Sequence, residues 1–350
     1  MRNQQNRNRL MGDLEAVVHH IIRPRGRKTI LIALSVTAAV IVGCVILFYM
    51  LPAGDRDQAL RAILEGILLG GVYALVALGV VVVYKSSKVF NLAHGAILML
   101  LAYFMWWLLA PTGLPLWIAL IIVAIASLLI ALVIDRFLMR PMIGQSGLTT
   151  FILTMVLGFS VIQGIAVLLF KGQPQVMPPI FPSGTLTVGS LTISYIWLSA
   201  FIVAAIMFLI FVSYFRFTRG GLAMRAVSED PIVCQSLGIA VKRIFSISWV
   251  VGCLSAAAGG ILLGSMFPVH QDMGNFAIIR ALPVVLLGGI ESIPGAFIGA
   301  LIIGVAERLA STYIDPHVTG FSQLLPFILI VVILIIRPHG LFGLREIRRI

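Results

Sequence analysis

The feature that most constrains this chain is a series of apolar segments, each long enough to cross a membrane. A spanning helix needs about 20 mainly apolar residues. Eight segments meet this requirement: 29–51, 60–84, 89–110, 116–134, 148–170, 193–215, 244–266 and 318–336. Only 11% of the residues are charged, against about 25% in a soluble domain. We therefore predict an all-α, polytopic integral membrane protein with about eight spanning helices.

A further apolar stretch, residues 276–309, is interrupted by Gly288-Gly289 and by the run Glu291-Ser-Ile-Pro-Gly295. It is long for one span and short for two. Lys and Arg accumulate on the cytoplasmic side of membrane proteins. If the N-terminus is cytoplasmic and this stretch enters and returns, both termini are cytoplasmic. Only five of the 25 basic residues are then external or embedded: Arg56, Arg61, Lys171, Arg280 and Arg308. A single crossing would add the basic C-terminal tail to these five, so we predict a broken hairpin of short helices that lines the protein core.

The N-terminus divides into a basic cytoplasmic tail, residues 1–28, and an extra transmembrane helix, residues 29–51. This apolar run is longer than the apolar core of a signal peptide, about 7–15 residues, so we expect it to be retained. In the tail, Leu14, Val17, Val18, Ile21 and Ile22 recur at helical spacing. They favour an amphipathic helix on the inner membrane surface, although a frayed basic tail remains open.

The sequence lacks the motifs of common catalytic and metal sites. It contains no G-x-x-x-x-G-K-[ST], H-E-x-x-H or G-x-S-x-G pattern, so neither a phosphate-binding loop nor a zinc or serine-hydrolase site is expected. The three cysteines, Cys44, Cys234 and Cys253, form no C-x-x-C pair. The net charge of +12 is explained by Lys and Arg in the segments expected on the cytoplasmic side, so it does not indicate nucleic-acid binding. We expect no catalytic residue, metal or cofactor in this chain.

The longest cytoplasmic loop, residues 216–243, contains signals for two short helices. Asp230 followed by Pro231 is a typical helix start, and Gly238 suits the position after a helix end. A second helix is expected over residues 222–227. Such a capped helical pair could dock into a groove on a cytoplasmic partner. An ordinary amphipathic loop resting on lipid headgroups is the alternative.

Polar residues inside the apolar segments are the second clue, because ionisable groups in a bilayer are costly and often functional. Glu65 lies one turn into the second segment, and Asn91 and His94 lie at the start of the third. They are candidates for lining a translocation pathway. Structural alternatives are that Asn91 caps its helix and that His94 meets a backbone carbonyl. Glu307-Arg308 suggests an ordinary interfacial pair.

Small residues recur at helical spacing in three apolar segments. The pairs are Gly66 with Gly70, Gly260 with Gly264, and Gly295 with Gly299. This spacing predicts helices that approach each other closely.

Several runs resemble the LivH-type permeases of branched-chain amino-acid ABC importers, in family order over residues 60–343. They are Gly71-Val-Tyr-Ala-Leu-Val-Ala-Leu-Gly79, Asn91-Leu-Ala-His-Gly95, Arg225-Ala226 with Asp230 and Gly238-Ile239, Leu287-Gly-Gly-Ile-Glu-Ser-Ile-Pro-Gly295, and Arg337-Pro-His-Gly-Leu-Phe-Gly343. The resemblance implies a permease subunit in a bacterial inner membrane, embedded in lipid and carrying an amino-acid substrate. Its partners would be a sister M-type permease, two cytoplasmic ATP-binding subunits and a periplasmic binding protein.

In that family the loop matching residues 221–239 couples the permease to the ATPases. Here Arg225 and Glu229 would provide ionic contacts, while Asp230 and Gly238 would shape the helix. Three features depart from the pattern: the helix at 29–51, Val233-Cys234 in place of two alanines, and Glu65 in place of a common Asn. The last leaves open a urea, amide or aromatic-acid substrate. A stand-alone secondary transporter or channel is the alternative function, and a membrane enzyme is a further one.

Overall fold

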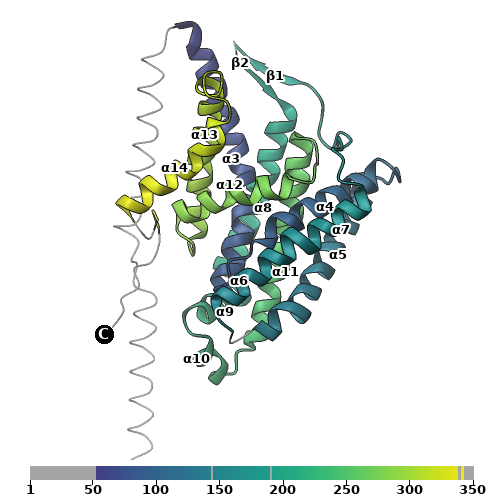
Figure 1. Ribbon diagram of the computed structural model, residues 1–350, viewed down its shortest axis with the longest axis vertical. Helices are drawn as coiled ribbons and strands as arrows, with labels where there is room; N and C mark the ends of the chain where they lie inside the picture. The colour runs from purple at the N-terminus through teal and green to yellow at the C-terminus, as the bar shows by residue number, and fades with distance from the viewer. Residues whose placement is uncertain (1–52, 143–144, 190, 338–339, 343–350) are drawn as a thin grey trace, which may run out of the picture. The chain divides into compact units, whose positions relative to one another are not determined.

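The structure is a computed structural model that describes residues 53–142, 145–189, 191–337 and 340–342. The predicted tail (1–28) and extra helix (29–51) lie outside the described residues. The helices are α3 (Ala53–Ser87), α4 (Ala93–Leu109), α5 (Leu116–Val133), α6 (Gly147–Val156), α7 (Gln163–Phe170), α8 (Tyr195–Phe217), α9 (Arg219–Glu229), α10 (Pro231–Ser236), α11 (Val241–Met266), α12 (Met273–Gly288), α13 (Ile293–Tyr313) and α14 (Phe321–Ile336) (Figure 1).

Two helices are extended by π-helical turns. The turn η1 (Ile134–Met139) and the 3₁₀ turn η2 (Arg140–Met142) continue α5, and η3 (Leu157–Ile162) joins α6 to α7. Within the described residues, six helical segments are long and apolar enough to cross a membrane. The all-α membrane class is therefore confirmed, but a count of eight spans is not. Helices α4 and α14 have only 17 and 16 residues.

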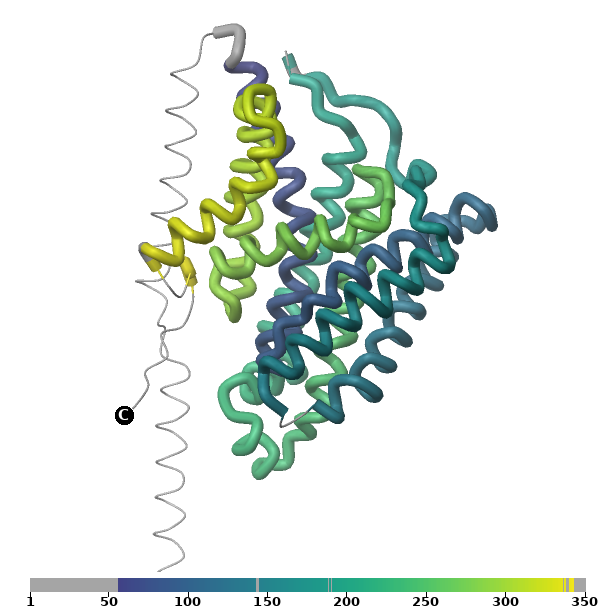
Figure 2. The backbone as a smooth tube through the Cα atoms, viewed as in Figure 1, coloured from purple at the N-terminus to yellow at the C-terminus, as the bar shows by residue number. Residues whose placement is uncertain are grey.

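Helix α3 forms the centre of the packing. Its side chains are apolar around the whole circumference between residues 68 and 83, and nearly all are buried, as expected for a helix enclosed by others. It packs against α8, α11, α12 and α13. Figure 2 shows α3 in purple running beside the yellow-green α13. The outer helices instead expose large apolar side chains, among them Trp117, Leu168 and Leu209, as lipid-facing helices do.

Glycines allow α3 and α13 to meet at backbone distance. A Cβ atom on Gly66 would lie 2.5 Å from the Cα of Val305, and one on Gly304 would lie 2.8 Å from the Cα of Gly70. The other predicted small-residue pairs also sit at close contacts. Gly260 faces a carbonyl of α4, and a Cβ on Gly299 would lie 2.7 Å from the Val284 carbonyl oxygen. The prediction of close helix approach is confirmed at the first and third pairs and at Gly260, whereas Gly264 faces the side chains of Met177 and Val269.

The broken hairpin over residues 276–309 is confirmed as α12 and α13, but one part of the prediction is wrong. Helix α13 has 21 residues and is long enough to span a membrane, so only α12 is short. The turn between them uses Gly289 at φ 100°, and the Ser292 hydroxyl caps α13 by accepting from the amide of Gly295 at 3.1 Å.

The turn of this hairpin is held from two sides. Lys88, which follows α3, forms an ion pair with Glu291. On the other side, the amides of Leu341 and Phe342 donate to the carbonyls of Leu287 and Gly288 at 2.8 and 3.1 Å. The C-terminal segment therefore completes the hydrogen bonding of the α12 end.

The segment 171–194 contains a β-hairpin that the sequence analysis did not predict. Strands β1 (Thr185–Val188) and β2 (Leu191–Ser194) pair antiparallel, with Thr185 opposite Ser194. Arg61 of α3 donates to the carbonyl of Thr192 at 3.2 Å and so fixes the hairpin to the end of α3. The alternation of Thr with Leu, Val and Ile around Gly189 was the available signal.

We predict that Gly304→Ala lowers the melting temperature of the purified protein. The new methyl group would meet only backbone atoms of α3, and overpacking of this kind costs about 1–3 kcal/mol. Gly164→Ala is the matched control, because no atom lies within 4 Å of its Cβ position and the change favours a helix by about 0.5–1 kcal/mol. Equal melting temperatures for the two variants would contradict the close contact.

Candidate functional site

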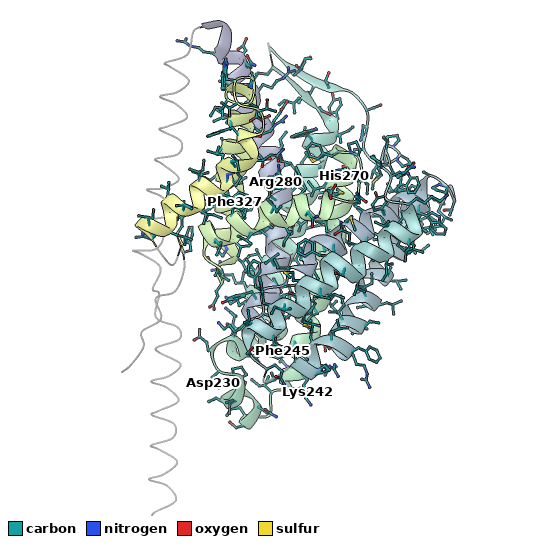
Figure 3. The ribbon with its side chains drawn as sticks, viewed as in Figure 1. Asp230, Lys242, Phe245, His270, Arg280 and Phe327 are labelled. Atoms are coloured by element: carbon teal, nitrogen blue, oxygen red, sulfur yellow. The ribbon has the colours of Figure 1, made fainter. Side chains whose placement is uncertain are left out.

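The loop 216–243 forms α9 and α10 at one end of the molecule, and the β1–β2 hairpin lies at the opposite end (Figure 1). In Figure 3, Asp230 and Lys242 mark the α9–α10 end of the molecule, far from Arg280. Helix α10 occupies the predicted residues. Helix α9 is longer than the predicted 222–227, because Thr218 caps it by accepting from the amide of Gly221 at 3.1 Å.

The predicted caps of α10 are confirmed. One carboxylate oxygen of Asp230 accepts from the amides of Ile232 and Val233 at 2.9 and 3.0 Å. Gly238 has φ 82°, a conformation that side chains with a Cβ rarely adopt. These two residues therefore determine where α10 begins and ends.

Helices α9 and α10, with the residue after α10, expose large apolar side chains. Four exposed side chains form what we name the α9–α10 patch: Leu222, Ile232, Val233 and Leu237, with exposures of 60, 79, 51 and 70%. Arg225 and Glu229 are exposed on α9. The patch lies outside the six segments able to span a membrane, and exposed apolar side chains of this kind mark contacts with a protein or with a membrane surface.

The patch is attached to the spanning helices by buried contacts. Met224 and Val227 of α9 are buried, and Asp135 of η1 accepts from Ser246 of α11 at 2.6 Å. Arg140 donates to the same Asp135 carboxylate at 3.0 Å. Cys234 is buried in α10; burial, with a contribution from the Asp230 charge, raises the pKa of its thiol. Helix α9 thus packs against α3, α8 and α11, and Asp135 joins η1 to α11.

Among the embedded residues, Glu65 does not stand alone. Its carboxylate forms an ion pair with Arg308 of α13, and both side chains are about one-quarter exposed, at 27 and 28%. The Arg308 guanidinium also lies over the ring of Trp197, 4.9 Å from the centroid. Glu65 and Arg308 therefore neutralise each other in this structure.

Asn91 and His94 lie in the packed interior near the start of α4, each 1% exposed. The N-cap position of α4 is occupied by Leu92, and no side chain accepts a hydrogen bond from the first amides of the helix. The alternative that Asn91 caps the helix is therefore wrong. The Val76 carbonyl interacts with the His94 imidazole, as the structural alternative expects. The Asn91 Oδ1 and His94 Nε2 atoms nevertheless have no hydrogen-bond partner among the described residues. Buried polar atoms of this kind require an explanation.

A buried charge pair that sequence analysis missed lies between α12 and α13. Arg280 donates to one oxygen of Glu307 from Nε at 2.8 Å and Nη2 at 2.7 Å. The hydroxyl of Tyr73 on α3 donates to the other oxygen at 3.2 Å. Both charged side chains are less than 10% exposed. The interpretation of Glu307 and Arg308 as an interfacial pair is wrong, because each pairs with a different helix.

In the described part of the chain, no three His, Cys, Asp or Glu side chains are arranged to hold a metal ion. The polar chemistry of the interior consists of ion pairs and of the unpaired atoms of Asn91 and His94. The α9–α10 patch adds exposed apolar surface.

Comparison with known proteins decides the family. The family model of branched-chain amino acid transport system permease components matches residues 62–334. The chain belongs to this family. LivH of Salmonella typhimurium, a high-affinity branched-chain amino acid transport system permease protein, is 31% identical over 305 residues, covering 83% of this chain and 97% of the relative. BraD of Pseudomonas aeruginosa, which has the same description, is 30% identical over 305 residues, covering 83% and 98%.

LivM of Escherichia coli matches less of the chain, with 29% identity over 125 residues, or 35% of this chain and 28% of the relative. The match along the whole length of LivH confirms the resemblance to LivH-type permeases. No solved structure matches the chain.

We predict that Asp230→Ala exposes the first turn of α10 to exchange. Loss of a capping carboxylate costs about 1 kcal/mol, so hydrogen exchange at the amides of Ile232 and Val233 should become about fivefold faster. Ser236→Ala serves as the control, because the Ser236 hydroxyl donates to a carbonyl and caps no amide. Unchanged exchange in Asp230→Ala would show that the cap is not formed in solution.

Proposed function

We propose that this chain is the permease subunit of an ATP-driven importer for branched-chain amino acids in a bacterial inner membrane. It would form the translocation pathway together with a sister M-type permease. Two cytoplasmic ATP-binding subunits would hydrolyse ATP, and a periplasmic binding protein would deliver the amino acid. The chain itself would need no cofactor.

The chain belongs to the permease family, and the structural observation that carries this proposal is the α9–α10 patch. Its four apolar side chains are exposed outside the segments that can span a membrane, which supports a surface that a protein partner covers. An ATP-binding subunit on the cytoplasmic side fits this role, with Arg225 and Glu229 giving ionic contacts at its edge. Both termini of the chain would then be cytoplasmic, and the β1–β2 hairpin would face the binding protein.

We propose that Glu65, Asn91 and His94 lie along the translocation pathway. The partial exposure of Glu65 supports a position near its outer mouth. The unpaired atoms of Asn91 and His94 are explained if these groups meet water or substrate when the helices move apart during the transport cycle.

The test of this proposal is purification of the chain from its native membrane in mild detergent, followed by mass spectrometry. Stoichiometric ATP-binding subunits and a second permease are expected, together with ATP-dependent leucine uptake after reconstitution. A homo-oligomer without ATPase subunits that still moves a solute would overturn the proposal and favour a secondary transporter or channel.

We predict that Gly238→Val uncouples ATP hydrolysis from uptake. A β-branched residue at this positive φ is strained by about 1–2 kcal/mol, which should displace the end of α10 and reduce leucine uptake at least tenfold in the assembled complex. Gly113→Val is the matched control, because Gly113 also has a positive φ and open surroundings but lies between α4 and α5. Normal uptake by an assembled Gly238→Val complex would remove Gly238 from the coupling assignment, and the same result for Asp230→Ala would remove Asp230.

A further inference from the structure

We propose that Arg280 and Glu307, with Tyr73, form an intramembrane binding site for the charged head of a zwitterionic substrate. The inference rests on the proposed import of an amino acid and assigns residues to a step inside the membrane. The Arg280 guanidinium would hold the substrate carboxylate, and the Glu307 carboxylate would hold the substrate ammonium group. Without substrate, the two side chains neutralise each other, as the structure shows.

The first argument is the cost of placing these charges where they are. Both side chains are more than nine-tenths buried, and they lie inside helices α12 and α13 rather than at their ends. Replacing a buried ion pair by apolar residues of similar volume is often neutral or stabilising. Packing alone therefore does not account for the pair. Ionisable groups at such depth usually serve transport or another function.

The second argument concerns which ligand could open the pair. A simple cation or anion would satisfy one partner and leave the other charge buried and unpaired, which is strongly unfavourable. An α-amino acid carries both charges on neighbouring groups and can satisfy Arg280 and Glu307 together. Tyr73 keeps its hydrogen bond to the second oxygen of Glu307, so one oxygen remains oriented during the exchange. The site thus selects zwitterions.

The third argument is the apolar surface beside the pair. The Arg280 guanidinium lies 3.3 Å from the ring centroid of Phe276. From there, ring centroids continue to Phe267 at 6.1 Å and to Trp197 at a further 5.8 Å. All three rings are partly exposed. Trp197 in turn contacts Arg308, the partner of Glu65. The rings therefore connect the two charge pairs and offer contact to an aliphatic side chain.

The local backbone also favours movement at this position. Helix α12 carries Pro283 in its interior, three residues after Arg280, and proline removes one hydrogen bond of the helix. A helix weakened there can shift Arg280 relative to Glu307 without unfolding. This makes exchange of the ion pair for substrate contacts compatible with the rest of the packing.

The test uses the complete reconstituted importer and measures molecules of radiolabelled leucine transported per ATP hydrolysed. In the double variant R280M/E307L the complex should assemble, keep ATP hydrolysis stimulated by the binding protein, and transport at least tenfold less leucine per ATP. Leucine transport per ATP within twofold of the wild type would overturn the inference, because the pair would then be structural only.

The matched control is K88M/E291L, which removes the ion pair between Lys88, after α3, and Glu291 in the turn of the hairpin. It should keep leucine transport per ATP within twofold of the wild type. An equal loss in both double variants would mean that any weakened contact with the hairpin reduces transport, and would overturn the inference.

Arg280→Lys decides the case if R280M/E307L does not assemble. Lysine keeps the charge but loses the planar fork that matches a carboxylate. We expect at least a threefold loss of leucine per ATP with unchanged ATP hydrolysis; an unchanged ratio would overturn the inference. A wild-type complex without ATP-dependent leucine uptake would instead contradict the proposed function itself, and the inference with it.

Discussion

The contact between α3 and α13 is the constraint on which much of the structure depends. Because Gly66, Gly70 and Gly304 carry no Cβ atom, the two backbones meet directly. At this separation the long side chains of the contact cannot fit between the helices and must project to its sides. Adjacent residues Glu307 and Arg308 therefore find partners eight residues apart on α3, at Tyr73 and Glu65. One close approach thus positions two charge pairs.

The polar groups of this molecule divide between two regions with different physical roles. At the α9–α10 end, charge and exposed apolar surface lie together outside the possible spans, which suits a partner that binds and releases. In the interior, the charges are paired and buried, so each rearrangement must supply a new partner for every charge that it separates. The interior can therefore change only in a few discrete ways, which is the behaviour required of a two-state transporter.

The features that the sequence predicts well are those decided by local chemistry. Apolar segments follow from the membrane itself, and the caps at Asp230 and Gly238 depend on a few neighbouring residues. The Arg280–Glu307 pair depends on the α12–α13 turn, whose geometry brings together residues 27 positions apart. The sequence identified both charges but not their pairing. The sequence likewise indicates Glu65 as a candidate residue but does not indicate that it pairs with Arg308, which is 243 positions away.

Two errors have a shared cause. Hydropathy alone predicts that the third span begins at Val89 and that the hairpin ends at Leu309. The observed boundaries depend on backbone hydrogen bonding: Lys88 adopts φ 55° and delays the start of α4, whereas α13 continues to Tyr313. Hydropathy indicates which segments are apolar enough to lie in lipid. Helix ends are instead set by where backbone amides and carbonyls find partners outside the helix.

The bonds from Leu341 and Phe342 to the end of α12 have a consequence for how the protein is made. Ribosomes synthesise the chain from the N-terminus, so α12 and α13 emerge well before the residues that complete their turn. Until residues 341 and 342 leave the ribosome, the carbonyls of Leu287 and Gly288 lack these two donors. The native turn is therefore finished only after α14 has been made, which makes residues 341 and 342 the part of the chain that commits the nascent hairpin.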